Sequence, residues 1–172
     1  DHDNVGACRE LVTVLFAKGI QNIAYLGSDM DQMVNRCRYQ GYEEAYRKGK
    51  RKLNPDLVYT DLSSKAMVEK AVEELKKSGV ECILCQDDYI CDEVVRKLAR
   101  MGVRIPEQMK VASCHYSRIL ENYPITVTSL KFNITELGRR SCQVLLDVIH
   151  GKTVPDKTLL DYEIILKEST KG

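Results

Sequence analysis

The sequence predicts an α/β fold, a mostly parallel sheet flanked by helices on both faces. Segments with an apolar stripe at helical spacing alternate with short β-like runs along the chain. Five helical segments end at a glycine, a residue that can close the last turn in the left-handed conformation: Gly19, Gly49, Gly79, Gly102 and Gly151. Strands separated by helices in this way pair in parallel. Ligands of such sheets bind at the carboxyl ends of the strands, here in the loops after Leu26, Tyr59, Cys85 and Ser113.

The expected elements follow one another without an internal repeat. Strands are expected at residues 22–26, 57–59, 82–85, 110–113, 126–130 and 159–167. Helices are expected at residues 4–18, 32–47, from near 63 to the glycine at 79, 89–101 and 133–150. Asp3 and Asn133 are expected to cap the first and last of these helices.

The second predicted helix carries an unusual interior glycine. Its inward face is expected to hold Met33, Cys37, Gly41 and Ala45. A glycine inside a helix costs about 1 kcal/mol relative to alanine. Gly41 therefore indicates a close approach of another segment.

Composition excludes several classes of protein. The 172 residues suffice for one domain with a sizeable core. The 26 basic and 25 acidic residues give a net charge of +1, and the densest basic patch, residues 47–52, closes a helix, where cations are favoured. No apolar run approaches the roughly 20 residues that a membrane span needs. The chain begins without a methionine and almost directly in a helix, so we expect it to be part of a longer protein.

The seven cysteines indicate a reducing compartment. Their number is odd and they lie within apolar stripes: Cys8, Cys37, Cys82, Cys85, Cys91, Cys114 and Cys142. A secreted disulfide framework would be even-numbered and rich in loops, so we expect buried, reduced thiols in a cytoplasmic protein. Cys82 and Cys85 form a C-x-x-C motif, but residues three apart on a strand point to opposite faces. This motif is therefore not expected to bind a metal or act in redox chemistry.

The order of segments resembles the effector-binding core of the lactose/galactose repressor family, whose fold is that of type I periplasmic sugar-binding proteins. The residues that carry the resemblance are Asp3–Ala7, Ile23–Gly27, Arg38–Tyr42, Asp88, Met101–Pro106, Thr128–Leu130, Leu137–Arg140 and Leu166–Thr170. The resemblance covers the whole chain but only the second half of such a regulator. It implies that residues 1–131 and 158–172 form the C-terminal subdomain. Residues 132–157 would carry a crossover helix that packs on a preceding subdomain.

The resemblance also implies a function. A small effector, a sugar, a sugar derivative or an anionic compound, would bind between two subdomains and control operator binding by a helix-turn-helix domain outside this chain. A homodimer is expected, without a cofactor and without membrane contact. The alternative is a solute-binding protein of a sugar transporter.

Arg38 is the first candidate for ligand contact. In the family, the arginine of the Arg-x-x-Gly-aromatic motif reaches the ligand cleft, and a guanidinium suits bidentate recognition. The alternative is a surface arginine in an ion pair, like Arg36. Asp87 stands where the family usually has a ligand-facing asparagine, and the alternative is a carboxylate that faces water. For the neighbouring Asp88 we expect a helix-capping role.

Three further candidates lie at strand ends. Asp29 is in the loop after the first strand. His115 stands where the family has an aspartate that grips sugar hydroxyls, and Phe132 where a polar residue often reaches the cleft. These changes place recognition of a neutral sugar in doubt, and a histidine could favour an acidic effector. His115 could equally be structural.

No pattern in the sequence indicates catalysis. The three histidines, His2, His115 and His150, are not expected to have the partners of a catalytic triad. No cluster has the spacing of metal ligands. We therefore expect a binding protein and not an enzyme.

Overall fold

The computed structural model describes all 172 residues and confirms the predicted fold class. Six strands form one sheet in the order β2-β1-β3-β4-β5-β6, with β6 antiparallel and all other pairs parallel. The strands are β1 (Ile23–Leu26), β2 (Val58–Tyr59), β3 (Cys82–Cys85), β4 (Lys110–Ser113), β5 (Thr128–Phe132) and β6 (Tyr162–Ile165). The central strands β1 and β3 are buried along their whole length, as expected for a sheet covered on both faces.

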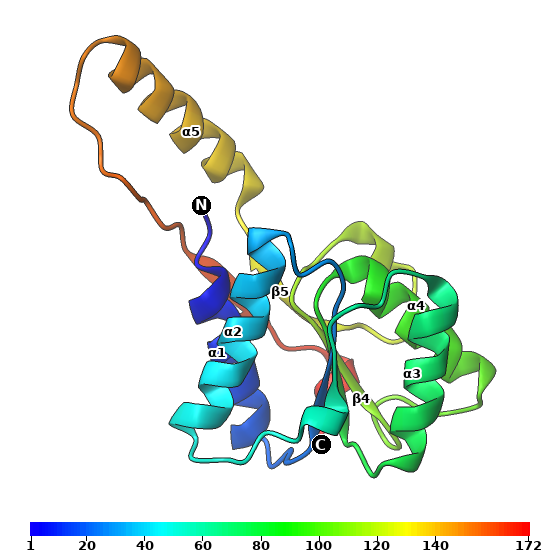
Figure 1. Cartoon of the computed structure of the whole chain (residues 1–172). Helices are drawn as coiled ribbons and strands as arrows, with labels where there is room; N and C mark the ends of the chain where they lie inside the picture. Colours follow the sequence, from blue (N-terminus) through cyan, green and yellow to red (C-terminus); the bar gives the residue numbers. More distant parts are fainter.

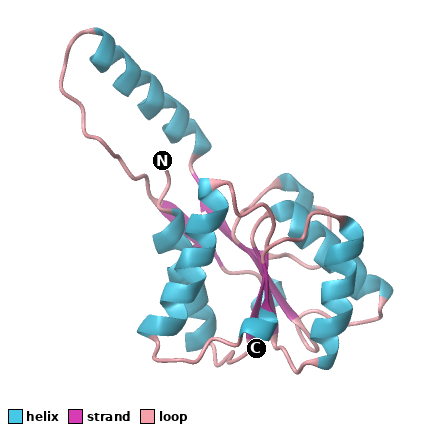
Figure 2. Ribbon diagram, viewed as in Figure 1, coloured by secondary structure: helices cyan, strands magenta, loops and turns pink.

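Four helices form the two outer layers (Figures 1 and 2). Helices α1 (Asn4–Ala17) and α2 (Met33–Lys48) cover one face, and α3 (Lys65–Lys77) and α4 (Asp88–Arg100) cover the other. Each face has its own apolar core, with 16 buried residues under α1 and α2 and 21 under α3 and α4. No helix combines the length and the apolar character needed to cross a lipid bilayer.

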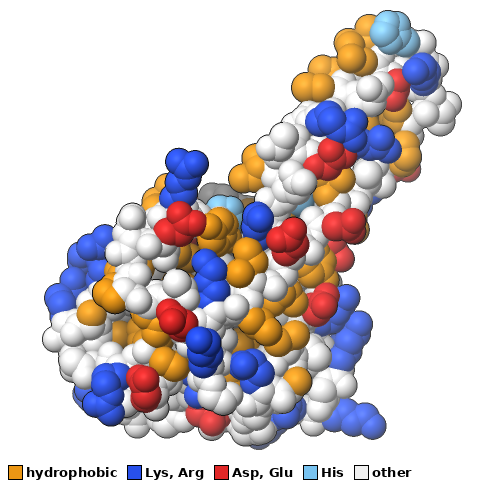
Figure 3. All heavy atoms as spheres, turned by 180° about the vertical axis from the view of Figure 1, so that it is seen from behind, with side chains coloured by type: hydrophobic (Ala, Val, Ile, Leu, Met, Phe, Trp, Pro, Cys, Tyr) orange, Lys and Arg blue, Asp and Glu red, His pale blue; other side chains and the backbone are white.

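The fifth helix, α5 (Ile134–Ile149), projects away from these layers (Figure 1). None of its residues is buried. Figure 3 shows hydrophobic side chains along the projecting arm, and the large exposed ones are Ile134, Leu145, Leu146, Val148 and Ile149. The body of this chain therefore does not supply the surface on which α5 could bury its apolar side.

Several predicted boundaries need small corrections. Leu57 belongs to a 3₁₀ turn (Pro55–Leu57), because Pro55 cannot donate to a sheet ladder and Asn54 accepts a hydrogen bond from the amide of Asp56. Strand β5 begins at Thr128 and extends to Phe132, two residues beyond the predicted end. Strand β6 is shorter than predicted because it pairs only with the last four residues of β5.

The predicted caps are confirmed with one exception. Asp3 and Asn133 accept hydrogen bonds from the amides of Gly6 and Glu136, at 2.8 and 2.9 Å. The glycines after α1, α3, α4 and α5 have positive φ angles, whereas Gly49 has φ −73°. Helix α2 runs one residue further than predicted, so the left-handed conformation falls on Lys50, with φ 53°.

The inward face of α2 differs from the prediction. Met33 is 66% exposed, and Cys37 is only half-buried. Gly41 and Ala45 are buried as predicted, and the rest of the buried face consists of Asn35, Arg38, Tyr42 and Tyr46. The apolar stripe mispredicted this face because two of the buried residues are polar, Asn35 bonded to the loop after β1 and Arg38 bonded beneath the strand ends.

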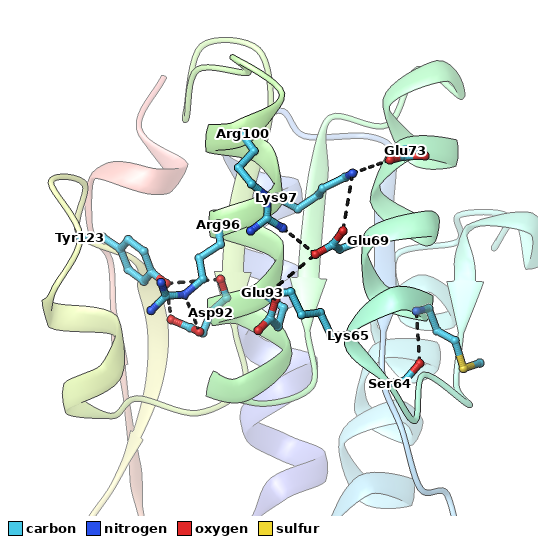
Figure 4. A network of polar contacts seen from close by, with 11 residues as sticks. Ser64, Lys65, Glu69, Glu73, Asp92, Glu93, Arg96, Lys97, Arg100 and Tyr123 are labelled. Atoms are coloured by element: carbon cyan, nitrogen blue, oxygen red, sulfur yellow. Dashed lines mark hydrogen bonds and ion pairs between the residues drawn. The ribbon is translucent and has the colours of Figure 1, made fainter.

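A network of ion pairs links the outer sides of α3 and α4 (Figure 4). Glu69 is 2.6 Å from the Arg100 guanidinium and 3.8 Å from the Lys97 ammonium, and Lys65 is 3.2 Å from Glu93. Lys97 also pairs with Glu73. Exposed pairs contribute little each, but several of them joined in a network across two helices add to the packing of the apolar faces of these helices.

The cysteines are free, as predicted, but not all are buried. Cys142 is exposed on α5 and Cys37 is half-buried on α2. The sulfurs of Cys82 and Cys85 belong to opposite faces of the sheet, since the two residues lie in different apolar cores. The prediction that the two cysteine side chains of this motif point to opposite faces of the sheet is confirmed.

We expect the thiols to react in a fixed order with a maleimide at neutral pH. Cys142 should react first and Cys37 second, because both are accessible. Burial raises the pKa of Cys8 and Cys85 well above the ordinary thiol value, so these groups and the other buried cysteines should react only after unfolding. Mass spectrometry of the labelled peptides checks the order. Early labelling of Cys82 or Cys85 would contradict the buried strand.

Candidate functional site

Three loops meet at the carboxyl edge of the sheet. Leu26, Cys85 and Ser113 are in register at the ends of β1, β3 and β4. The residues that follow these three strands therefore start from the same level of the sheet. Helix α5 leaves the body from this same edge, directly after β5 (Figure 1).

Gln86 ties two of these loops together. Its side chain is fully buried, its amide nitrogen donates to the carbonyl of Ser28 at 3.1 Å, and its amide oxygen accepts from the amide of Ser28 at 3.2 Å. The hydroxyl of Tyr25 donates to the same oxygen, and burial raises the pKa of Tyr25 so that it keeps its proton. A Cβ atom at Gly27 would lie 2.4 Å from the Gln86 side chain, so any larger residue there would displace this side chain from its hydrogen bonds.

The importance of Gln86 is not foreseen from the sequence. The available signal is a polar residue placed directly after a fully apolar strand. Such a residue is buried only when its hydrogen bonds are satisfied, and the groups that satisfy them come from a loop 58 residues earlier.

Arg38 lies under this edge and is only 8% exposed. Its Nε donates to Oδ1 of Asn4 at 3.3 Å, and one Nη donates to the carbonyl of Gln86 at 3.0 Å. The guanidinium belongs to none of the ion pairs of the structure. The alternative of a surface arginine in an ion pair is therefore wrong for Arg38. Arg36, by contrast, is exposed and bonds to two loop carbonyls.

His115 forms a pair with a buried carboxylate. Its Nδ1 lies 3.2 Å from Oδ1 of Asp88, whose side chain is 8% exposed. An ionised carboxylate only accepts hydrogen bonds, so Nδ1 carries the proton and Nε2 of a neutral ring is left as an acceptor. Ser113 fixes the loop, since its hydroxyl donates to the carbonyl of His115 and accepts from its amide.

Phe132 and His115 line one pocket of about 610 Å³. The Phe132 ring also packs on the ring of His2, with centroids 4.7 Å apart. Nε2 of His2 is buried without a hydrogen-bond partner, and burial lowers the pKa of this imidazole. A side-chain nitrogen of Asn4 donates to the carbonyl of His2, so a continuous series of contacts joins Phe132 to Arg38.

The model of the periplasmic binding protein-like domain matches residues 12–170. The chain belongs to this family. Similar curated proteins are the helix-turn-helix transcriptional regulators CelR of Thermobifida fusca, 27% identical over 98% of this chain and 51% of the regulator, and GntR of Pseudomonas aeruginosa, 28% identical over 91% and 46%. The resemblance to the lactose/galactose repressor family is thereby confirmed. The chain spans about half the length of the curated relatives it matches.

Solved structures agree with this assignment. A CelR–cellobiose complex superposes with a TM-score of 0.87 at 26% identity, over 98% of this chain and 53% of that chain. The regulator CcpA of Lactococcus lactis superposes with a TM-score of 0.88 at 24% identity, over 99% and 63%, and supports the fold alone.

In this periplasmic binding protein-like domain, Asp87 takes the capping role predicted for Asp88. The carboxylate of Asp87 accepts from the amide of Ile90 at 2.9 Å and caps α4, so the capping role predicted for Asp88 is wrong. The helix starts one residue earlier than predicted, which turns Asp88 inward toward His115. Asp87 lines a separate hollow of about 310 Å³ that also includes Ser28. A ligand contact of Asp87 stays a prediction.

Asp29 lies apart from the other candidates. It is exposed, has φ 47°, and its carboxylate accepts from the side chain of Gln32 at 2.6 Å. Its own carbonyl accepts from Asn35. These contacts fix the loop after β1, and a ligand contact of Asp29 also stays a prediction.

Neither a metal centre nor a catalytic triad is assembled at this edge of the domain. No three His, Cys, Asp or Glu side chains converge as metal ligands. The expectation that no histidine has a triad-like carboxylate partner is wrong for His115, because Asp88 follows on α4 and reaches back. No hydroxyl or thiol is hydrogen-bonded to the His115 ring, so the pair lacks a nucleophile. The arrangement offers donors, acceptors and a ring face for binding.

Proposed function

We propose that this chain is the effector-binding and dimerisation part of a cytoplasmic, DNA-binding transcriptional regulator. The observation that carries the proposal is the match of 98% of the chain to about half of a helix-turn-helix regulator. The effector is a small molecule, a sugar or sugar derivative, seated on the edge that carries Arg38, His115 and Phe132. The solved complex of a similar regulator with cellobiose supports this ligand class. The curated relatives weigh against a solute-binding protein of a transporter.

Residues 1–131 and 158–172 form the subdomain that holds one wall of the effector cleft in this proposal. Residues 132–157 carry α5 to a preceding subdomain that supplies the other wall. The exposed apolar side of α5 supports this arrangement, because Leu137, Val144, Leu145 and Val148 line a groove that also includes Asp1. A segment attached to Asp1 would therefore begin beside the apolar groove of α5 that the preceding subdomain is proposed to cover.

Control of DNA binding follows from the two-subdomain cleft. An effector that binds one relative orientation of the subdomains better than the other shifts their equilibrium. In a dimer, this shift changes the spacing of the two DNA-binding heads. The full-length protein on its operator DNA tests the proposal through fluorescence anisotropy, with a panel of sugars, sugar acids and sugar phosphates added. Release of the DNA by one of them is expected, and no response to any small molecule would contradict the regulator function.

The chain of residues 1–172 by itself should show no specific DNA affinity. Its charges balance, and no basic stripe is present to release counterions from phosphates. Titration with labelled operator DNA at physiological salt measures this. Tight operator binding by the isolated chain would contradict the assignment of DNA binding to another domain.

Replacement of Arg38 by alanine should weaken effector binding by about 10- to 100-fold. A polar group that loses a hydrogen bond to a ligand costs about 1–3 kcal/mol, and each 1.4 kcal/mol is about tenfold in affinity. Calorimetry on the full-length protein measures the change. Arg36→Ala, at an exposed position on the same helix, is the matched control and should bind as the wild type does. Equal affinities of all three proteins would remove Arg38 from the binding site.

A further inference from the structure

Three stretches of the chain meet at the base of the arm that carries α5 (Figure 1). They are residues 1–3 before α1, residues 132–133 between β5 and α5, and residues 158–162, where the chain returns from α5 into β6. The amide of Leu160 donates to the carbonyl of Asp1 at 2.9 Å, and His2 forms an isolated parallel bridge with Leu160. In the two-subdomain arrangement proposed above, the connections between the subdomains pass through this junction.

His2 is the residue that contacts both other stretches of the junction. Its backbone pairs with Leu160, and its ring packs on the ring of Phe132 with the centroids 4.7 Å apart. Phe132 is the last residue of β5, and the next residue, Asn133, caps α5 by accepting from the amide of Glu136. A change in the position of the His2 ring therefore acts directly on the segment from which α5 starts.

The packed position of the His2 ring suits only its neutral form. Nε2 is buried without a hydrogen-bond partner, and His2 belongs to none of the ion pairs of the structure. Protonation places an N–H group on both ring nitrogens, and burying a charge that has no partner is costly. Burial accordingly lowers the pKa of this imidazole, the backbone of Asn133 opposes the effect in part, and the nearby His115 lowers the pKa further.

The groups around the ring do not supply the missing negative charge. Asp1 accepts from the amide of His2, Asp3 caps α1, and Asp88 pairs with His115. The other titratable side chains on the neighbouring stretches are Lys131, Asp161, Tyr162 and Glu163. Of these, Lys131 pairs with Glu163, and Tyr162 donates to Glu10. A protonated His2 would therefore have to leave its packed position to reach water.

Resting on the two-subdomain arrangement proposed above, we propose that His2 is an acid-sensitive latch at the junction of the subdomains. A neutral ring stays packed on Phe132 and holds the three stretches together. Protonation moves the ring into water and loosens the segments about which the subdomains would turn. The neutral ring contributes fully above the ordinary histidine pKa of 6.5, and its contribution declines as the pH falls below this value, because the packed state binds the proton less well.

Hydrogen exchange of the full-length protein at pH 7.5 and pH 5.5 tests the latch without an effector. The amides of Asn4 and Leu160, which are bonded to the carbonyls of His2 and Asp1, report on the junction. After correction for intrinsic exchange rates, their protection should fall at pH 5.5 by up to about tenfold, since one proton changes an equilibrium by at most about tenfold per pH unit. His2→Phe keeps an aromatic ring without a proton to gain and should be equally protected at both pH values. His150→Phe, at an exposed position after α5, is the matched control and should respond as the wild type does.

The His2 ring itself gives a second measurement that needs no variant. Its Cε1–H signal in the NMR spectrum of the wild type should titrate below pH 6.5, and the loss of protection should follow the same curve. A pH response that persists in His2→Phe would assign the effect to another group and overturn the proposal. Unchanged protection of the wild type between the two pH values would do the same, as would a His2 signal that titrates without any loss of protection.

The latch and the regulator function fail in different ways. A small molecule that releases the full-length protein from operator DNA, when the protection of Leu160 does not depend on pH, keeps the regulator and overturns the latch. Loss of protection at pH 5.5 that requires His2, with no effect of any small molecule on DNA binding, keeps the latch and overturns the regulator function.

Discussion

The isolated chain should self-associate in solution through α5. No residue of this helix is buried, and its apolar side chains line an open groove beside residues 155–160. Exposure of a contiguous apolar patch of roughly 300–500 Å² is near the largest that monomeric proteins tolerate. At about 25 cal/mol per Å², its burial offers on the order of 10 kcal/mol before the costs of association. Light scattering should therefore find a dimer or a larger species at micromolar concentration.

One substitution separates this effect from a general tendency to aggregate. Leu145 is 61% exposed and lies in the groove, so Leu145→Lys should shift the chain toward the monomer. Gln143→Lys, an exposed polar position on the same helix, is the matched control and should associate as the wild type does. A wild-type chain that stays strictly monomeric would mean that α5 folds back onto its own sheet in solution.

Gly41→Ala should lower the free energy of unfolding by about 2 kcal/mol, although alanine favours a helix by about 1 kcal/mol. A Cβ atom at this position would lie 2.4 Å from the carbonyl oxygen of Val5 and 2.8 Å from Cβ of Cys8. The nearest obstacle is backbone, so α1 and α2 must move apart. The close packing predicted from this glycine is confirmed. Denaturant unfolding followed by circular dichroism measures the loss.

Gly138→Ala provides the opposite case within the same chain. Gly138 also lies inside a helix, but no atom lies within 4 Å of its ideal Cβ position. This variant should be as stable as the wild type or gain up to about 1 kcal/mol in helix α5. Equal stabilities of the two variants would contradict the tight contact between α1 and α2. Because Asn4 and Arg38 lie on these two helices, Gly41→Ala should also weaken effector binding.

Local sequence patterns predicted a helix or strand correctly wherever the residues of that element decide its structure. Short β-like runs bounded by turn residues located β3 and β4 to the residue. Strand β3 is continuously apolar because it is buried on both faces. Capping side chains located the starts of α1 and α5, because each cap accepts a hydrogen bond from an amide only three residues away. The apolar pattern mispredicted the inward face of α2, because Arg38 and Asn35 are polar residues whose burial depends on hydrogen bonds to distant loops.

The sequence named the candidate residues of the site but not the residues that they contact. The family resemblance named Arg38, His115 and Phe132 as candidates, in keeping with the rule that ligands bind at the carboxyl ends of parallel strands, and their ligand contacts stay predictions. His115 meets Asp88 across 27 residues, and Phe132 meets His2 across 130 residues. The one-residue shift of the α4 start moved the cap from Asp88 to Asp87. Boundaries of this kind depend on which side chain accepts a hydrogen bond from a free backbone amide.

The sequence by itself therefore determined the fold class, the strand ends that carry the candidate residues and the residue types found there. These depend on hydrophobic period, turn chemistry and capping, all of which act over a few residues. Only the tertiary structure decided that Gln86 is buried between two loops and that Arg38 has no negative partner. Each of these depends on which groups from distant parts of the chain come within hydrogen-bond or packing distance, and hydrophobic period does not carry that information.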